Sequence, residues 1–275
     1  MATVSRLKIA IAQTASGADK RHNIERAVAL VREAADTGAA VVALPETFDF
    51  RGDTARLPDV AEPLPGSAIS ALMAVARDLG IWVLAGSVHE RHPDGGMPYN
   101  TSVLITPAGD TAAVYRKIHL FDISIGGRSV AESAHYSRGR DVVCATAAGV
   151  KVGLSICYDM RFPELYRRFA DAGTDLVFIP SSFTAPTGEA HWEVLVRARA
   201  IENQCFVAAP GQAGIGAGGI PTYGNSMIVD PWGRVLARAS GEGEQVIAAT
   251  LDFEEMAAIR ERLPALHNRK LPVIR

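Results

Sequence analysis

The segment GLSICYDMRFPELYRRF, residues 153–169, changes from an apolar strand to a charged helix within a few residues. Cys157 stands at that junction, and Tyr158 and Asp159 follow it directly. Pro163 suits the first turn of a helix, where its missing N–H would have no partner anyway. A thiol at such a turn is expected to have a lowered pKa, because it faces the positive helix end and exposed N–H groups. The pattern predicts a strand–turn–helix unit in which Cys157 is either a nucleophile or the structural end of a core strand.

On both sides of this segment the chain alternates between strand-type and helix-type patterns. An α/β fold of mixed sheets is therefore expected, and residues 1–275 are predicted to form a single domain, because no Ser/Gly/Pro-rich linker divides them. Residues 124–140 follow neither period and are predicted to be a long loop. The expected strands are 7–14, 39–46, 81–90, a hairpin over 99–117, the run into Cys157, and 174–182; the expected helices are 18–38, 66–80, 162–172, 189–204 and 253–263.

Charge and hydropathy exclude several classes of partner. The net charge is −2, and no basic cluster is longer than Arg167-Arg168, so nucleic acid is not an expected partner. No apolar stretch reaches the 18 residues that a membrane span needs, and the N-terminal apolar run is too short for a signal peptide. A cytoplasmic location without membrane association is the resulting expectation.

The remaining cysteines and a glycine-rich motif favour structural interpretations. Cys144 and Cys205 lie in strand-like apolar runs, where buried packing is expected. Three cysteines without a C-x-x-C spacing predict neither a disulfide framework nor a zinc site, so no metal is expected. GIGAGG (214–219) satisfies G-x-G-x-x-G, but Ile220-Pro221 follows it in place of a helix, so a flexible loop is expected there.

Two further strand ends carry charged residues. Glu46 follows the apolar run VVALP, and Lys117 ends the strand TAAVYR. For either residue alone, a charge pointing into water is the simpler interpretation. Strand ends converge at one edge of an open α/β sheet, however, and ligands bind there. A carboxylate, an ammonium and a thiol at one edge of a sheet are chemically complementary. The carboxylate can accept the thiol proton, and the ammonium can stabilise the anion that forms when the sulfur attacks a substrate.

Three segments together resemble a known family. LPETFDF (44–50), YRKIHLFDI (115–123) and GLSICYDMRFPELYRRFADAG (153–173) are similar to the signature segments of the nitrilase superfamily, the carbon–nitrogen hydrolases with a Glu-Lys-Cys triad. Two later segments, 180–209 and 223–237, resemble the Nit branch, which includes amidases of deaminated glutathione and ω-amidases. The resemblance implies a four-layer αββα sandwich of two mixed sheets flanked by helices. It also implies a homodimer or higher homo-oligomer that pairs through helices near the active site.

The resemblance also assigns catalytic roles. Cys157 attacks the amide carbon, and the Lys117 ammonium with the Tyr158 N–H stabilises the oxyanion. Glu46 moves the proton to the leaving nitrogen, which departs as ammonia, and then activates water against the thioester. Glu132, between the Lys and Cys segments, matches the family's second glutamate and is expected to position substrate or support Lys117. This chemistry requires no metal or organic cofactor.

The substrate implied by the resemblance is a small amide that bears a carboxylate, such as deaminated glutathione or another α-keto acid ω-amide. Arg161 is the expected partner of that carboxylate, and Thr184 is expected to join it; a helix-entry arginine that pairs with Asp159 or Glu164 is the alternative for Arg161. An N-carbamoyl amino acid or aliphatic amide hydrolase is the alternative function. A redox-active thiol protein is a more distant one, and it gives no reason for Glu46 and Lys117.

Overall fold

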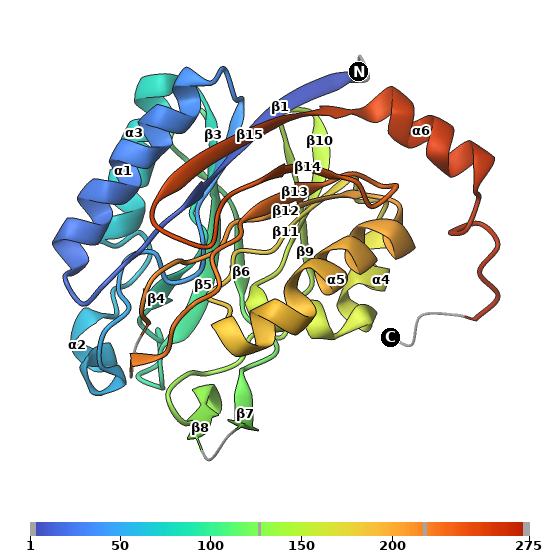
Figure 1. The fold of residues 1–275 in the computed structure, drawn as a ribbon. Helices are drawn as coiled ribbons and strands as arrows, with labels where there is room; N and C mark the ends of the chain where they lie inside the picture. The colour runs from blue at the N-terminus through green and yellow to red at the C-terminus, as the bar shows by residue number, and fades with distance from the viewer. Residues whose placement is uncertain (1–3, 126–127, 217–218, 272–275) are drawn as a thin grey trace.

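The structure is a computed structural model that describes residues 4–125, 128–216 and 219–271. Two β-sheets stacked face to face form its centre, and helices cover their outer faces (Figure 1). Strand β1 (Arg6–Gln13) shows how the sequence produces this layering, because successive side chains of a strand point to opposite faces. Ile9 and Ile11 join the core between the sheets, whereas Ala10 and Ala12 pack with residues of the outer helices.

The first sheet has seven strands. Its β1, β2 and β3 are parallel, and the other pairs are antiparallel. The order is β15 (Gln245–Asp252), β1, β2 (Val41–Ala43), β3 (Trp82–Leu84), β5 (Tyr99–Ile105) and β4 (Val88–Glu90), with β6 (Thr111–Arg116) paired to β5.

The second sheet has six strands, with β10, β11 and β12 parallel. Its order is β14 (Val235–Arg238), β13 (Met227–Val229), β12 (Phe206–Ala209), β11 (Leu176–Phe178), β10 (Val150–Leu154) and β9 (Val143–Ala147). Because parallel strands run together in both sheets, several strand ends meet at one end of the sandwich.

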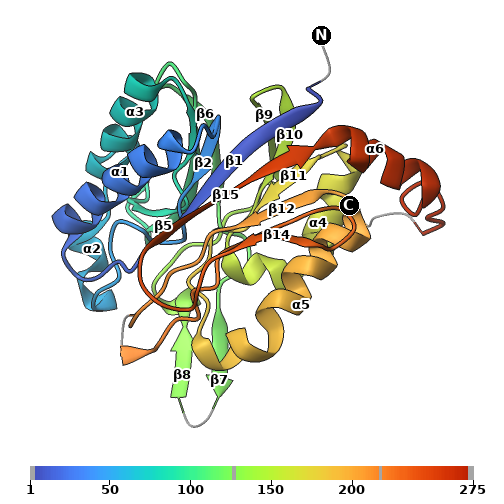
Figure 2. The same ribbon diagram turned by 45° about the horizontal axis from the view of Figure 1, so that its top comes forward.

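Helices form the two outer layers. Helices α1 (Lys20–Asp36) and α3 (Ser67–Leu79) cover the first sheet, and α4 (Pro163–Asp171) and α5 (Ala185–Asn203) cover the second (Figure 2). The predicted αββα sandwich is therefore confirmed. Among the described residues, the other helices are α2 (Leu57–Val60), α6 (Phe253–Arg262) and the 3-10 helices η1 (Thr54–Arg56), η2 (Glu132–Ala134) and η3 (Cys157–Arg161). Within the described ranges, no helix has the length and apolar character needed to cross a bilayer.

Three sequence-based expectations differ from the structure. The strand expected over 81–90 is two strands, β3 and β4, because the chain breaks at Gly86. The loop expected over 124–140 contains the hairpin of β7 (Asp122–Ile125) and β8 (Arg128–Ala131), although its residues 126–127 lie outside the described chain. The helix expected from residue 189 begins at Ala185, since Thr184 is its N-cap. The loop expected at 214–219 includes residues 217–218, which also lie outside the description.

The break at Gly86 brings two backbone segments into contact. A Cβ at residue 86 would lie 1.9 Å from the carbonyl oxygen of Pro45, and φ of Gly86 is +33°. The next residue, Ser87, donates its N–H to Pro45 O at 3.2 Å and accepts the N–H of Thr47 on its hydroxyl at 2.9 Å. The turn that carries Glu46 is thus held by the segment after β3.

We predict that Gly86→Ala lowers the free energy of unfolding by about 2–4 kcal/mol, because the methyl group overlaps Pro45 and the backbone is left-handed. Gly95→Ala is the matched control. Its φ is +81°, but nothing lies within 4 Å of the added Cβ, so only the backbone cost of about 1 kcal/mol is expected. Denaturant unfolding measures both; equal losses would contradict the close approach at Pro45.

Candidate active site

Three strand ends from the two sheets deliver the candidate catalytic groups. Glu46 follows β2 and Lys117 follows β6 in the first sheet, while Cys157 follows β10 in the second. The side chains of Glu46 and Lys117 are buried, with 4% and 2% of each residue exposed. All three residues line one cavity of about 730 Å³, together with Glu132 of η2.

Cys157 sits on a strained turn. Its φ is +46°, in the left-handed region that residues with a Cβ seldom adopt. The fully buried carboxylate of Asp159 holds the turn, because it accepts the N–H of Ile156 at 2.8 Å and the N–H of His119 at 3.0 Å. The Cys157 N–H donates to Pro180 O at 2.9 Å. Such strain persists only where the surroundings fix it, which is typical of an active-site residue.

Lys117 lies between two carboxylates. Its Nζ is 2.8 Å from Glu46 Oε1 and 2.8 Å from Glu132 Oε2. Asn100 in β5 also joins the carboxylates, since its Nδ2 donates to Glu46 Oε1 at 2.9 Å and to Glu132 Oε1 at 3.2 Å. The Ser182 N–H donates to the other oxygen of Glu46 at 2.7 Å. The four predicted groups, Glu46, Lys117, Glu132 and Cys157, therefore occur together.

These contacts set the protonation states. Burial alone would raise the pKa of Glu46, but the Lys117 ammonium and hydrogen bonds from its neighbours bring that pKa below its usual value. Burial would lower the pKa of Lys117, but Glu132 and Glu46 raise it well above the usual range. Burial and then the Glu46 charge raise the pKa of Cys157 well above its usual value, and Lys117 opposes this only in part. The expectation of a lowered thiol pKa was therefore wrong, because desolvation and the Glu46 carboxylate outweigh the Lys117 ammonium and the Ser182 N–H.

The predicted oxyanion donor, the Tyr158 N–H, lies at the start of η3, although Tyr158 is not among the residues that line the cavity. Tyr158 is the second residue of η3, whose first hydrogen bond runs from Asp159 N–H to Ile156 O at 3.0 Å. The Tyr158 N–H therefore has no acceptor within this turn, as is usual for the first N–H groups of a helix.

The structure does not bring Arg161 and Thr184 to the wall of this cavity. The Arg161 guanidinium lies 5.3 Å from the ring centre of Phe183, and its two terminal nitrogens are each 3.3 Å from His191 Nδ1. Thr184 is the N-cap residue of α5, and its hydroxyl lies 2.7 Å from that of Thr187. Their roles in substrate binding remain predictions.

Residues that the sequence did not predict complete the site. Asn100 and Ser182 hold the carboxylates, and no local pattern marks either one. Asp159 could have been found, since a carboxylate two residues after a strained turn is well placed to accept the turn's N–H groups. Arg51 also lines the cavity, five residues after Glu46.

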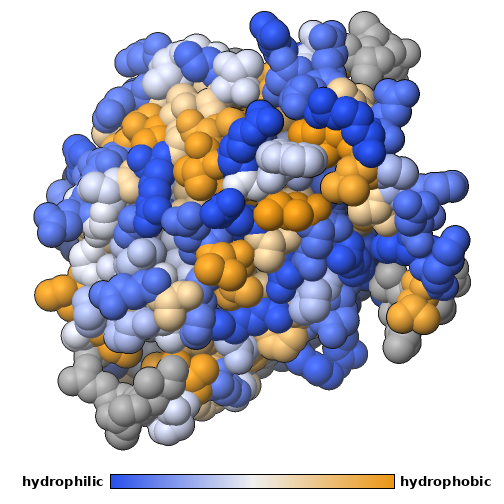
Figure 3. All heavy atoms as spheres, turned by 45° about the vertical axis from the view of Figure 1, so that its right-hand side comes forward, coloured by the Kyte–Doolittle hydropathy of each residue, from blue (hydrophilic) through white to orange (hydrophobic). Residues whose placement is uncertain are grey.

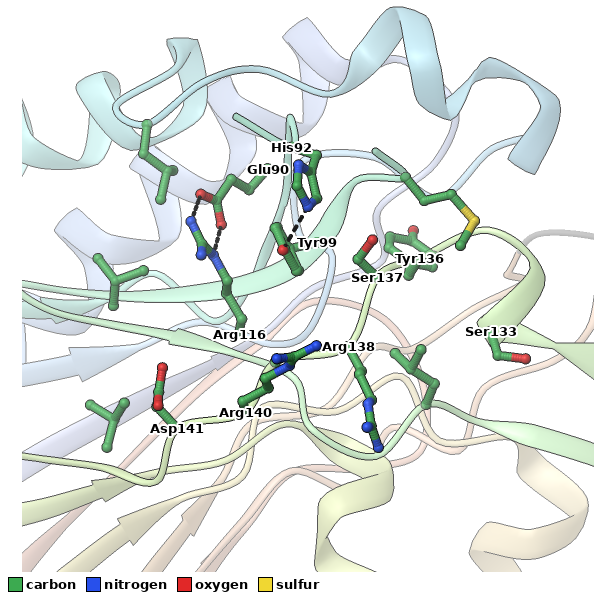
Figure 4. A pocket seen from close by; sticks show the side chains of 16 residues that line it. Glu90, His92, Tyr99, Arg116, Ser133, Tyr136, Ser137, Arg138, Arg140 and Asp141 are labelled. Carbon is green, nitrogen blue, oxygen red and sulfur yellow. Dashed lines mark hydrogen bonds and ion pairs between the residues drawn. The ribbon is translucent and has the colours of Figure 1, made fainter. Parts of the chain in front are cut away.

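A second, larger cavity of about 870 Å³ lies next to this site (Figure 4). Its wall includes Arg116, which donates to Glu90 at 2.8 Å, and Arg138 and Arg140. Tyr136 belongs to both walls. The larger cavity has no thiol on its wall, so the smaller one is the candidate reaction site. In the part of the chain that the structure describes, no cluster of His, Cys, Asp and Glu could hold a metal ion.

A thiol, a carboxylate and an ammonium that line one cavity are a combination that suits a cysteine-dependent hydrolase. The carbon–nitrogen hydrolase family profile matches residues 8–261. The chain belongs to this carbon–nitrogen hydrolase family, whose members hydrolyse C–N bonds, and the predicted family is confirmed.

Individual relatives cover almost all of the chain. A Homo sapiens protein named deaminated glutathione amidase is 42% identical over 269 residues, 95% of this chain and 82% of its own. A Mus musculus protein named ω-amidase NIT2 is 40% identical over 268 residues, 97% of this chain and 96% of its own. The crystal structure of the C. elegans NitFhit protein matches with a TM-score of 0.90 at 36% identity, over 99% of this chain and 68% of that one. The matches support an enzyme that hydrolyses amides.

We predict that the resting thiol of Cys157 is protonated at neutral pH. The difference in thiolate absorbance near 240 nm between wild type and Cys157→Ala should be absent at pH 7 and appear only at strongly alkaline pH, because burial and Glu46 disfavour the thiolate. Cys144→Ala is the control and leaves this difference unchanged. A thiolate signal already present at pH 7 would contradict the assigned protonation.

We also predict that Asn100→Ala lowers kcat by roughly 10- to 100-fold, because Glu46 and Glu132 lose the donor that fixes their positions. Ser102→Ala is the matched control on the same strand face. The Ser102 hydroxyl is buried and has no hydrogen-bond partner among the described residues. Steady-state kinetics compare the two variants. If kcat falls equally in both, the loss reflects a general disturbance of β5 and contradicts a specific role for the contacts of Asn100 with the two carboxylates.

Proposed function

We propose that the protein hydrolyses a linear amide through a thioester on Cys157, with Glu46 as general base and Lys117 and the Tyr158 N–H as oxyanion donors. The observation that carries this proposal is the buried contact of Lys117 Nζ with Glu46 and Glu132 in the cavity that holds Cys157. A redox-sensing thiol would have no use for two carboxylates around a buried ammonium.

The first half-reaction forms the thioester. Glu46 takes the thiol proton as the Cys157 sulfur bonds to the amide carbon, and the carbonyl oxygen becomes an oxyanion beside Lys117 and the Tyr158 N–H. The tetrahedral adduct then collapses, the C–N bond breaks, and Glu46 returns the proton to the leaving nitrogen. A primary amide releases ammonia, and a secondary amide releases the corresponding amine.

The second half-reaction frees the acid. Glu46 is again ionised and takes a proton from water, whose oxygen attacks the thioester carbon. Lys117 stabilises the second oxyanion, the C–S bond breaks, and the sulfur regains a proton from Glu46. Water is consumed once, and the enzyme returns to its starting state.

Glu132 is assigned to support Lys117 rather than to accept protons. Its Oε2 accepts the Phe121 N–H at 2.6 Å as well as the Lys117 ammonium, so its lone pairs are occupied. A carboxylate fixed in this way keeps the ammonium charged and directs it toward the substrate oxygen.

The substrate proposed is deaminated glutathione or a similar α-keto acid ω-amide, in line with the names of the human and mouse relatives. An N-carbamoyl amino acid or an aliphatic amide is the second candidate, because the triad acts on any reachable amide. Arg161 and Thr184 belong to this proposal as candidate contacts for the substrate carboxylate.

A homodimer is also proposed, with α5 in the interface. Two residues of this helix have exposed apolar side chains, Val194 at 67% and Ile201 at 46%, and Trp232 in the turn before β14 is 51% exposed. The side of the molecule that carries α5 and α6 shows apolar groups interspersed with charged ones (Figure 3). Exposed aliphatic and aromatic groups of this kind are typical of interfaces. The cytoplasmic location remains a prediction.

We predict that Cys157→Ala abolishes release of ammonia or amine, by more than about 1000-fold in kcat, while the far-UV circular dichroism stays native. Cys144→Ala is the matched thiol control and keeps the activity. The screen compares deaminated glutathione, α-ketoglutaramate, an N-carbamoyl amino acid and an aliphatic amide. Full turnover by Cys157→Ala would refute the role of Cys157 as nucleophile. A wild-type protein that hydrolyses none of these amides but forms a sulfenic acid at Cys157 with peroxide would favour the redox alternative.

A further inference from the structure

Arg51 is a buried cation in the wall of the Cys157 cavity. Only 7% of this residue is exposed, and it lies on the segment that follows Glu46. Its main-chain N–H donates to Gly17 O at 2.9 Å, which fixes the segment against the loop after β1. The position of Arg51 is therefore set by backbone contacts as well as by its side chain.

Neutral groups hold only part of the guanidinium. Nη1 donates to Ala213 O at 3.1 Å and to Gln212 Oε1 at 3.2 Å, which uses both of its N–H groups. Nη2 donates to the Thr222 hydroxyl at 3.3 Å. Nε–H and the second N–H of Nη2 have no acceptor among the described residues. Nε and Nη2 form one edge of the guanidinium, the edge that binds a carboxylate with two parallel hydrogen bonds.

The charge of Arg51 has no counter-ion at close range. Among the described residues, no Asp or Glu lies within ion-pair distance, that is 4.0 Å, of its guanidinium, although Glu46 raises its pKa from farther away. Burial lowers the pKa of Arg51 to about 10, so the group is still charged at neutral pH. A buried charge without a partner is unfavourable, and an anion that enters the cavity would remove that cost.

The surroundings keep the guanidinium in this place. A Cβ at Gly216 would lie 2.6 Å from Nη2, so the backbone at Gly216 packs closely against the guanidinium. Asp53 also lines the cavity, but it is exposed to solvent, and its carboxylate accepts the N–H of Ala55 at 2.9 Å instead of pairing with Arg51. Arg161, by contrast, is partly exposed and stacks on aromatic rings, so water solvates part of its charge.

We propose that Arg51 binds a carboxylate of the substrate through its Nε–Nη2 edge, and that this contact makes the enzyme prefer anionic amides over neutral ones. The inference rests on the proposed amidase function and adds a specificity residue to it. The structural alternative is that Arg51 only ties residues 212–222 to the segment after β2.

The test compares one amide in two forms, a five-carbon ω-amide with a free carboxylate and its methyl ester, which lacks the charge. In Arg51→Gln, the ratio of kcat/KM for the acid to that for the ester should fall about 10- to 100-fold, mostly through KM for the acid, because a charge-assisted pair of hydrogen bonds is lost. Arg51→Lys keeps the charge but lacks the two-donor edge, so the acid-to-ester ratio of kcat/KM should fall by less in this variant. Arg56→Gln on the same segment is the matched control, since Arg56 does not line the cavity, and its ratio should equal that of wild type.

A purely structural Arg51 predicts a different result. Arg51→Gln would then reduce kcat/KM for the acid and the ester by the same factor, and that outcome would overturn the proposal. Arg161→Gln is measured beside it: loss of the preference in Arg161→Gln alone would assign the carboxylate to Arg161 and also overturn the role of Arg51.

A binding measurement separates this inference from the proposed reaction. Calorimetry measures the Kd of glutarate for Cys157→Ala protein, with and without Arg51→Gln, and needs no turnover. A Kd weakened about 10-fold or more by Arg51→Gln supports the anion site. An unchanged Kd refutes it. Wild-type protein that hydrolyses no amide but binds glutarate through Arg51 would refute the proposed function alone.

Discussion

The Lys117 ammonium, held between Glu46 and Glu132 away from water, is the interaction on which the site depends. All three charged groups are largely buried, so each would be strongly unfavourable alone. Burial of the thiol, and then the negative charge of Glu46, keep the proton on sulfur, and the Lys117 ammonium opposes them only in part. The arrangement therefore differs from a thiolate–imidazolium pair. In the proposed mechanism, the nucleophile forms only when Glu46 removes the thiol proton during attack, and Lys117 then stabilises the oxyanion on the substrate.

The sandwich fold makes this cluster possible, because its members come from different sheets. Glu46 and Lys117 follow strands of the first sheet, and Cys157 follows a strand of the second. Their separation is thus set by how the sheets pack, and apolar residues such as Ile9, Ile11 and Leu154 fill that interface. The site residues themselves are fixed by local contacts: the backbone of Gly86 packs against Pro45, and the Asp159 carboxylate accepts an N–H of the turn at Cys157. The packing of the two sheets brings the groups together, and these local contacts fix their orientation.

The sequence predicted those parts of the molecule that leave a local pattern. Helices α1 and α3 follow from apolar periodicity and from a glycine just past each helix end, at Gly38 and Gly80. The division of 81–90 into β3 and β4 did not follow, because the approach of Gly86 to Pro45 involves a segment that is distant in the sequence. The β7–β8 hairpin was missed because its strands are only four residues long, too short for an alternating pattern to stand out. Asn100 and Arg51 could not be predicted, since their importance lies in partners from distant segments.

Arg51 changes how the charge of the cavity should be understood. The cluster of Glu46, Lys117 and Glu132 alone would repel an anionic substrate, since its net charge is negative. The buried guanidinium of Arg51 on the same wall balances that charge, and its unfilled edge offers a carboxylate two donors. A neutral amide would leave this edge of the buried guanidinium unpaired, whereas an anionic amide would satisfy it. Selectivity for anionic amides thus follows from the same principle as the catalytic cluster, in which buried charges are stable only with their partners.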